Sequence, residues 1–222
     1  MRTLVIGDIH GSLSALEALS EFVDFAPDDT IVTLGDYVDR GPDSKEVIDF
    51  LIELRESHEV VTLKGNHEVM MENARHSEQE LYFWLMNGGE ATLNSFHVAN
   101  PNRLGKEVSQ RYWHFIAACD RFYETSNQII VHAGLDAETD LEDQDDRDLY
   151  WRRILNTEPH QSGKKLICGH TPQKNGDPLV LDHAVCIDTF AFGKDGWLTC
   201  LDIETGTYWQ ANSDGETRKN TL

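Results

Sequence analysis

The stretch that decides the fold is Gly65-Asn66-His67-Glu68, at the end of an apolar segment. The preceding run Val61-Thr62-Leu63 is β-branched and apolar, which is typical of a buried strand, and Gly65 ends it. Asn66 offers an amide oxygen and His67 an imidazole, both just past the predicted strand end. Because ligands gather at the carboxyl ends of strands in open α/β sheets, this position is a candidate binding site.

The same pattern occurs twice upstream. An apolar run at 3–6 precedes Gly7-Asp8-Ile9-His10-Gly11, and another at 30–34 precedes Gly35-Asp36-Tyr37-Val38-Asp39-Arg40-Gly41. Apolar residues recur at helical spacing at 13–23 and again at 47–54. This alternation of strands and helices predicts an α/β protein with a parallel core sheet and helices on its faces.

Downstream, the apolar pattern changes twice. Helical spacing over about 68–118 predicts a mostly helical insertion within a single domain that spans 1–222. Two strands are predicted near 122–132, ending in Val131-His132-Ala133-Gly134, and a further strand precedes Gly169-His170-Thr171-Pro172. Eight acids among positions 136–148 favour a solvated loop, followed by a short helix carrying two arginines. Short runs over 178–209 predict a β meander, which we expect to form a second sheet.

Composition narrows the class of protein. With 19 basic and 39 acidic residues among 222, the net charge is -20, which argues against nucleic acid or an anionic membrane as partner. Four cysteines without CxxC spacing favour reduced thiols in the core, and no run approaches the roughly 20 apolar residues of a membrane span. The apolar run at the N-terminus is too short for a secretory leader, so we expect a cytoplasmic protein.

Ionisable and amide side chains follow five predicted strands. They are Asp8, His10, Asp36, Asn66, His67, His132 and His170. Each alone is typical of a turn or a surface histidine, but their joint occurrence at strand ends indicates one site. Mixed oxygen and nitrogen ligands suit divalent Mn, Fe or Zn, and this number fits two ions that share a bridging carboxylate. Such pairs assist phosphoryl displacement, and their charge would attract phosphate to an acidic protein.

The three blocks resemble those of the phosphoprotein phosphatase (PPP) family, within the calcineurin-like metallophosphoesterases. His132 in Val-His-Ala-Gly and His170 in Gly-His-Thr-Pro extend the resemblance. The segments Asn87-Gly88-Gly89, 141–144 and 149–153 resemble the bacterial serine/threonine members, so the likeness runs from about residue 2 to 205. It implies two mixed β-sheets packed as a sandwich and flanked by helices.

The resemblance also implies a set of metal ligands. Asp8 and His10 would hold one ion, Asp36 would bridge two, and Asn66, His132 and His170 would hold the second. The ions, most simply Mn with Fe or Zn as alternatives, would activate a bridging water or hydroxide for direct attack on phosphorus.

Further residues carry catalytic and substrate-binding roles by the same resemblance. His67 would protonate the leaving group, with Asp39 orienting the imidazole. Arg40, Asn66 and Arg153 would bind the substrate phosphate. Arg152 is the alternative to Arg153.

The sequence departs from the family at Asp188-Thr189-Phe190, where bacterial members often have Asp-Thr-Gly. A large side chain is therefore expected near the rim of the site. The C-terminal extension of large eukaryotic relatives is lacking, so docking of their regulatory subunits is not expected.

Three functions remain open from the sequence. The favoured one is a serine/threonine protein phosphatase acting on a phosphorylated protein or small phosphoester. The second is a symmetrical diadenosine-tetraphosphate hydrolase. The third is a non-catalytic phosphatase-fold binding module, which the presence of His67, Asp39, Arg40 and every ligand disfavours.

Overall fold

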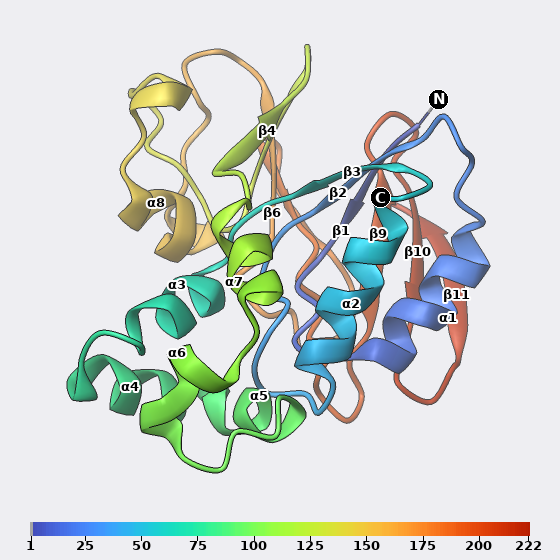
Figure 1. Cartoon of the computed structure of the whole chain (residues 1–222). Coiled ribbons are helices and arrows are strands. Elements are labelled where there is room, and N and C mark those ends of the chain that lie inside the picture. The colour runs from blue at the N-terminus through green and yellow to red at the C-terminus, as the bar shows by residue number, and fades with distance from the viewer. Residues whose placement is uncertain (1) are drawn as a thin grey trace.

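Two β-sheets form the centre of the protein, and helices surround them (Figure 1). The computed structural model describes residues 2–222. The first sheet has the strand order β11-β10-β9-β1-β2-β3, and the second has the order β4-β5-β6-β8-β7. Each sheet contains both parallel and antiparallel pairs, so the predicted arrangement of two mixed sheets is confirmed.

The strands of the first sheet come from both ends of the chain. They are β1 (Thr3–Ile6), β2 (Thr30–Thr33), β3 (Glu59–Thr62), β9 (Leu198–Asp202), β10 (Thr207–Ala211) and β11 (Thr217–Thr221). The first three are parallel and are joined through α1 (Leu13–Val23) and α2 (Ser44–Leu54), as the sequence predicts. The second sheet comprises β4 (Phe122–Glu124), β5 (Gln128–Val131), β6 (Lys165–Cys168), β7 (Leu179–Val180) and β8 (Ala184–Cys186).

Alternating side chains of β1 show how the layers pack. Leu4 and Ile6 belong to the large core cluster that includes Leu16 and Leu19 of α1. Val5 belongs instead to a cluster between the sheets, together with Ile130 of β5 and other residues of both sheets. Because successive side chains of a strand point to opposite faces, β1 buries one face against helices and the other against the second sheet. The sandwich follows from this two-sided burial.

Helices fill the segment between β3 and β4, within the part of the chain described. They are α3 (Asn66–Asn73), α4 (Glu78–Trp84), the π-helix η1 (Leu85–Gly89), α5 (Glu90–Ser95), the 3-10 helix η2 (Pro101–Arg103), α6 (Leu104–Glu107) and α7 (Gln110–Ala117). Figure 1 shows α3 to α7 gathered below the second sheet, with α5 beside α2. Trp84 and Ile116 of this segment are fully buried.

The C-terminal strands correct one prediction. Of the predicted meander, only β7 and β8 join the second sheet, whereas β9 and β10 extend the first sheet beside β1. In β9, Leu201 packs between the sheets and Cys200 faces the helices, so both faces of the strand are apolar. Such an apolar run predicts a strand but does not tell which sheet the strand joins. The polar edge strand β11 was missed because Thr217–Thr221 contains no apolar residue.

The acidic segment is more ordered than predicted. It contains the 3-10 helix η3 (Leu141–Asp143) and the start of α8 (Asp146–Trp151), and the 3-10 helix η4 (Ile154–Asn156) follows. The side chain of Asp145 accepts the Arg147 N–H at 2.7 Å and caps α8. The helix ends at Trp151, so the expectation that it carries Arg152 and Arg153 is wrong.

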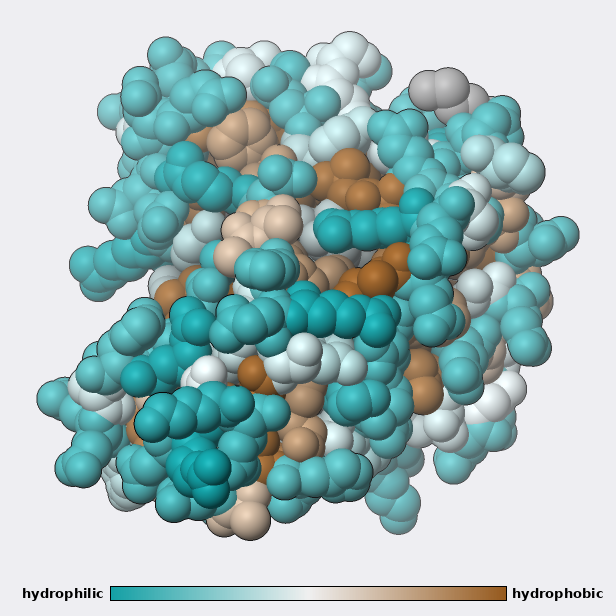
Figure 2. All heavy atoms as spheres, viewed as in Figure 1, coloured by the Kyte–Doolittle hydropathy of each residue, from teal (hydrophilic) through white to brown (hydrophobic). Residues whose placement is uncertain are grey.

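The surface is mainly polar, as expected for a chain rich in charged residues. Figure 2 shows a face that is mainly hydrophilic, with hydrophobic residues visible chiefly in its recesses. All four cysteines are free thiols, and three of them are buried. No helix among residues 2–222 is long and apolar enough to cross a bilayer.

Candidate metal centre and active site

Five strand ends converge on one small cavity. Its volume is about 240 Å³. It is lined by Asp8, His10, Asp36, Arg40, Asn66, His67, Asn87, Trp151, Arg153, His170, Pro172 and Asp188. His132, at the end of β5, lies directly behind this lining, with its Nε2 3.0 Å from Asn66 Oδ1. The structure therefore brings together nearly all of the residues singled out in the sequence, and Asp39 is the one that stands further back.

Asp36 lies at the centre of the cluster. Its Oδ2 is 3.4 Å from His10 Nε2, and its Oδ1 is 3.6 Å from His132 Nε2. Two groups of potential ligands can be drawn with atoms within 4.8 Å of one another: His10, Asp36 and His67, and Asp36, His132 and His170. Asp36 is common to both, which is the arrangement that a carboxylate shared by two ions requires.

Backbone carbonyls fix the tautomers of two histidines. His10 Nδ1 lies 3.0 Å from the Val38 carbonyl oxygen, and His132 Nδ1 lies 2.9 Å from that of Leu34. When each Nδ1–H donates to its carbonyl, each Nε2 presents a lone pair to the cluster. Burial lowers the pKa of both imidazoles and favours this neutral form.

The lone pair on His132 Nε2 then faces the amide oxygen of Asn66. Its Oδ1 lies 3.0 Å from His132 Nε2 and 2.9 Å from His170 Nδ1. Since His132 has donated its Nδ1–H to a carbonyl, no proton remains for the contact between its Nε2 and the amide oxygen. A cation among these three atoms would resolve the conflict, so the donor set fits a metal ion.

Asp8 provides a second test of the fit. Its Oδ2 accepts the His170 N–H at 3.0 Å, but its buried Oδ1 has no hydrogen-bond partner in the described part of the chain. Burial and the nearby carboxylates of Asp188 and Asp36 raise the pKa of Asp8. A buried carboxylate oxygen without a partner is costly, and a divalent ion would satisfy it. The unpartnered oxygen of Asp8 is thus a second feature of the cavity that fits a bound cation.

The charge of Asp36 is stabilised by its neighbours. Burial alone would raise its pKa, but the imidazoles of His132, His67 and His10 and the His67 N–H hydrogen bond lower it below the ordinary value. Asp36 is therefore ionised, whereas the anionic form of the neighbouring Asp8 is disfavoured. A bound cation would stabilise the anionic form of Asp8 as well.

His67 and Asp39 form a buried pair at the edge of the cluster. His67 Nδ1 lies 2.6 Å from Asp39 Oδ2, and His67 Nε2 is 3.1 Å from Arg40 Nη2. Burial lowers the pKa of His67, but the carboxylates of Asp36 and Asp39 outweigh that effect and raise it overall. The imidazole is therefore held in one orientation with Nε2 toward the cavity, where in this structure it accepts an N–H of Arg40, which has donors only.

Two residues that the sequence did not single out hold Asp39 in place. The indole N–H of Trp84 donates to both carboxylate oxygens, at 3.0 and 2.8 Å, and the Thr92 hydroxyl donates to Oδ1 at 2.6 Å. Both residues lie in the helical segment, 45 and 53 positions from Asp39. Trp84 falls within the helical insertion predicted over about 68–118, and no local pattern reveals such a distant partner.

The Asn87-Gly88-Gly89 motif accounts for the approach of this segment. A Cβ on Gly89 would lie 2.5 Å from the Trp84 ring, and one on Gly88 would lie 2.9 Å from Arg40 Cγ. Gly88 has a φ of 110°, and its carbonyl oxygen accepts the Arg40 N–H at 3.2 Å. Asn87 lines the cavity. The two glycines thus let this part of the helical segment pack closely against Arg40 and Trp84 at the edge of the cavity.

Glu68 ties two of the site loops together. Its carboxylate accepts backbone N–H groups of Asp36, Tyr37 and Val38 at 2.8 to 3.2 Å, and that of Gly65 at 2.9 Å. The side chain is fully buried at the start of α3, where acidic groups are favoured. The last residue of the Gly65–Glu68 block therefore shapes the loop that presents Asp36.

Backbone strain is concentrated at the site. Eight residues other than glycine have positive φ among those described, and five are candidate site residues: His10, Asp36, Asp39, Arg40 and His170. Such conformations cost about 1 to 3 kcal/mol each and persist where the surrounding contacts enforce them. Their accumulation here separates this cluster from an ordinary set of buried polar residues.

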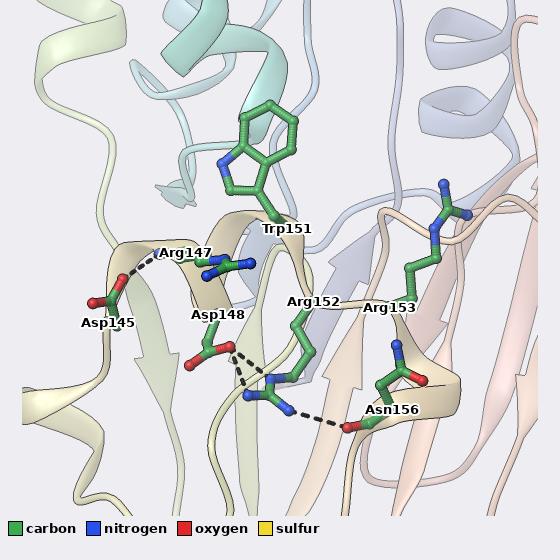
Figure 3. A pocket seen from close by; sticks show the side chains of 7 residues that line it. All are labelled: Asp145, Arg147, Asp148, Trp151, Arg152, Arg153 and Asn156. Atoms are coloured by element: carbon green, nitrogen blue, oxygen red, sulfur yellow. Dashed lines mark hydrogen bonds and ion pairs between the residues drawn. The ribbon is translucent and has the colours of Figure 1, made fainter.

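The two arginines after α8 point to different places (Figure 3). Arg152 Nη2 lies 2.7 Å from Asp148 Oδ1, and its Nη1 donates to the Asn156 carbonyl. Arg153 extends away from them and lines the cavity of the cluster. It also lines an open groove of about 680 Å³ that continues past Trp151. Of the two arginines, only Arg153 is thus placed beside the candidate ligands.

Asp188 is a further cavity residue to which the sequence reasoning gave no role. It follows β8 and is almost fully buried, and burial raises its pKa to about 7. It was noted only because Phe190 follows it, although its position after a predicted strand is the same feature that singled out Asp8.

Most of the chain matches a known protein family. The profile of the Calcineurin-like phosphoesterase family matches residues 1–196. Serine/threonine-protein phosphatase 1 of Salmonella typhimurium is 36% identical over 210 residues, which cover 90% of this chain and 91% of that protein. A symmetrical bis(5'-nucleosyl)-tetraphosphatase of Pseudomonas syringae pv. syringae is 34% identical over 140 residues, 61% of this chain and 42% of that protein.

Solved structures share the fold at low sequence identity. A crystal structure of a putative diadenosine tetraphosphatase has a TM-score of 0.67 and 18% identity, covering 99% of this chain and 93% of that chain. A cold-active protein-tyrosine phosphatase of a psychrophile, Shewanella sp., has a TM-score of 0.65 and 17% identity, covering 98% and 80%. At this level of identity, the likeness extends to the fold alone.

Proposed function

This chain belongs to the calcineurin-like phosphoesterase family, and from that premise we propose that it is a metal-dependent serine/threonine protein phosphatase. The observation that carries the proposal is the match, over 91% of its length, to a relative named as a serine/threonine-protein phosphatase. The cavity supports it, since His67, Arg40 and Arg153 line it together with the candidate ligands. The family match and this relative are those of a hydrolytic phosphatase, and the proposal adds the serine/threonine substrate class.

The metal centre of the proposal contains two divalent ions, most simply manganese. We assign Asp8 and His10 to one ion and Asn66, His132 and His170 to the other, with Asp36 shared between them. In support, His10 Nε2 lies 3.4 Å from Asp36 Oδ2, and Asn66 Oδ1 lies within 3.0 Å of His132 Nε2 and His170 Nδ1. When bound, such ions supply Lewis-acid stabilisation of phosphate charge and lower the pKa of water. Carboxylate, imidazole and amide ligands suit Mn, Fe or Zn, and the donor set does not distinguish among them.

The protein's own residues then divide the remaining tasks. Arg40 and Arg153, exposed at the cavity, bind the oxygens of the phosphate through planar guanidinium groups, with the Asn66 amide beside them. Attack of water on phosphorus leaves an alkoxide of serine or threonine, which needs a proton. His67 Nε2 faces the cavity and donates that proton, while Asp39 orients the ring and supports its charge.

A second candidate activity is symmetrical hydrolysis of diadenosine tetraphosphate. The relative from Pseudomonas syringae named for that activity favours it, with 34% identity over 61% of this chain. The same cluster and the same general acid would serve, because both reactions attack phosphorus with water. The two reactions would differ in their leaving group, which would occupy the groove beside Trp151.

The test compares substrates on manganese-loaded enzyme. Phosphoserine and phosphothreonine peptides, a phosphotyrosine peptide, para-nitrophenyl phosphate and diadenosine tetraphosphate are assayed at matched concentrations. The proposal expects the highest kcat/KM on the phosphoserine or phosphothreonine peptides. Release of ADP from the dinucleotide with little phosphate from any peptide would overturn it in favour of the second candidate.

A further inference from the structure

Arg40 is presented at the cavity without an acidic partner. Its guanidinium carbon lies 4.6 Å from the ring centroid of Phe192, and its Nη2 lies near His67. Among residues 2–222, no carboxylate oxygen lies within 4.0 Å of its guanidinium nitrogens. This is unexpected in a chain with a net charge of -20, where acids are in large excess.

The backbone and the first side-chain carbons of Arg40 are held by contacts with Gly88. Its N–H donates to the Gly88 carbonyl at 3.2 Å, and a Cβ at Gly88 would lie 2.9 Å from Arg40 Cγ. The side chain therefore starts against a glycine that leaves it room and ends over an aromatic ring. Arg40 lines the cavity, and the one side-chain hydrogen bond of its guanidinium in the described part of the chain is that of Nη2 to His67 Nε2.

Phe192 is itself held by aromatic neighbours. Its ring meets that of His10 at a centroid distance of 4.9 Å and that of Phe190 at 4.5 Å, both edge to face. Phe190 has a φ of 66°, and a Cβ on Gly193 would overlap its ring. The residue expected at the rim therefore packs against Phe192, and it is not among the residues that line the cavity.

We propose that Phe192 is a positioning residue for the phosphate-binding Arg40, with Phe190 as its support. An acidic partner would neutralise Arg40 and occupy the N–H donors that a phosphate needs. An aromatic face attracts the cation through its π electrons and leaves those in-plane donors free. The proposal rests on the proposed role of Arg40 and adds the means by which its guanidinium stays oriented without an acidic partner, with one Nη2 contact to His67.

The experiment measures binding of inorganic phosphate to the manganese-loaded protein by calorimetry, and its Ki against para-nitrophenyl phosphate. Phe192→Leu removes the π face and is expected to weaken phosphate binding about 2- to 30-fold. Phe192→Tyr keeps the ring and should restore the wild-type affinity. Elemental analysis of each variant checks that the contact with His10 has not altered the metal content.

A double-mutant cycle separates this role from general packing. In the Arg40→Ala background, Phe192→Leu should cause no further loss of phosphate affinity, because its effect acts through the guanidinium. An equal loss in both backgrounds, or no loss in either, would overturn the proposal. Phe192→Met is the second variant should the leucine protein not fold, and Phe22→Leu, at an exposed position of α1, is the matched control.

Failure of this inference can be told apart from failure of the proposed function. Inorganic phosphate is the anion common to phosphopeptides and to small phosphoesters, so the binding cycle does not depend on which substrate is preferred. An enzyme that hydrolyses only diadenosine tetraphosphate would overturn the protein phosphatase proposal and leave the link between Phe192 and Arg40 intact.

Discussion

Asp39 and His67 are 28 positions apart in the sequence, yet Asp39 Oδ2 lies 2.6 Å from His67 Nδ1 in a buried part of the site. The contact exists because Gly35–Gly41 and Gly65–Glu68 follow adjacent parallel strands, β2 and β3. Trp84 of α4 and Thr92 of α5 then hold the carboxylate in place. The pair sets both the direction and the proton affinity of the imidazole.

Removing the charge of Asp39 should alter the pH dependence of catalysis. In the wild type, the carboxylates raise the pKa of His67, so its protonated form persists as pH rises. Asp39→Asn lowers that pKa, and the alkaline limb of the kcat profile on phosphoserine peptide is expected to move to lower pH. Steady-state rates from pH 5.5 to 9 measure it. An unmoved limb with a reduced plateau would mean that Asp39 does not act through the titration of His67.

Replacing His67 should affect substrates according to their leaving group. His67→Asn is expected to lower kcat on serine phosphate about 10²- to 10⁴-fold, because the alkoxide loses its proton donor. Hydrolysis of para-nitrophenyl phosphate should fall much less, since nitrophenolate leaves without a proton. Metal content by elemental analysis should stay unchanged. Full activity on serine phosphate would remove His67 from the mechanism.

Asp36→Asn should disrupt the metal centre. Asp36 is the ligand candidate common to both groups, and its ionised form is stabilised by the histidines around it. An amide of the same shape cannot supply negative charge to two cations, so we expect loss of at least one manganese ion per chain. Elemental analysis after gel filtration, with Asp43→Asn at the half-buried N-cap of α2 as control, gives the count. Two ions retained in the variant would contradict the bridging role.

Glu68→Gln should lower stability rather than act on chemistry directly. Four backbone N–H groups converge on the Glu68 carboxylate, and an amide would direct an N–H of its own at some of them. Leaving such donors unpaired in the interior should cost about 3 kcal/mol. The free energy of unfolding in urea, on chelator-treated protein, measures this loss.

Glu72→Gln is the control for Glu68, because Glu72 forms a partly exposed ion pair with Lys64 at 2.9 Å. Its replacement should cost under about 1 kcal/mol. Equal losses at the two positions would indicate that the backbone contacts of Glu68 stabilise the fold no more than a surface ion pair does.

Arg153 and Arg152 form a matched pair for testing phosphate binding. Arg153 lines the cavity, whereas Arg152 is paired with Asp148. Arg153→Ala should lower kcat/KM on phosphopeptides by about 10-fold or more, as expected for a charge-assisted contact. Arg152→Ala should leave kcat/KM within about 3-fold of the wild type, and its effect should appear as a small loss of stability. The reverse ranking would assign the phosphate contact to Arg152.

The sequence by itself determined the parallel core and the candidate ligands. Each of Asp8, Asp36 and Asn66 follows a short apolar run and stands beside a glycine, and that local pattern specifies both the strand and what lies past its end. Since parallel strands bring their carboxyl ends to one edge, convergence of these residues could be predicted without coordinates. The same reasoning extended to Asp188 would have placed it in the cavity.

Only the tertiary structure decided which distant side chains support the site. The contacts of Trp84 with Asp39 and of Phe192 with Arg40 join segments 45 and 152 positions apart, and no periodicity encodes them. The apolar patterns of the C-terminal strands likewise allow either sheet, so only the structure assigns each strand to its sheet. Only the structure, too, shows that Arg153 and not Arg152 lines the cavity. Local propensity reports what a segment can form, whereas partners and directions are fixed by how separate elements pack, and that information is absent from any single stretch of the chain.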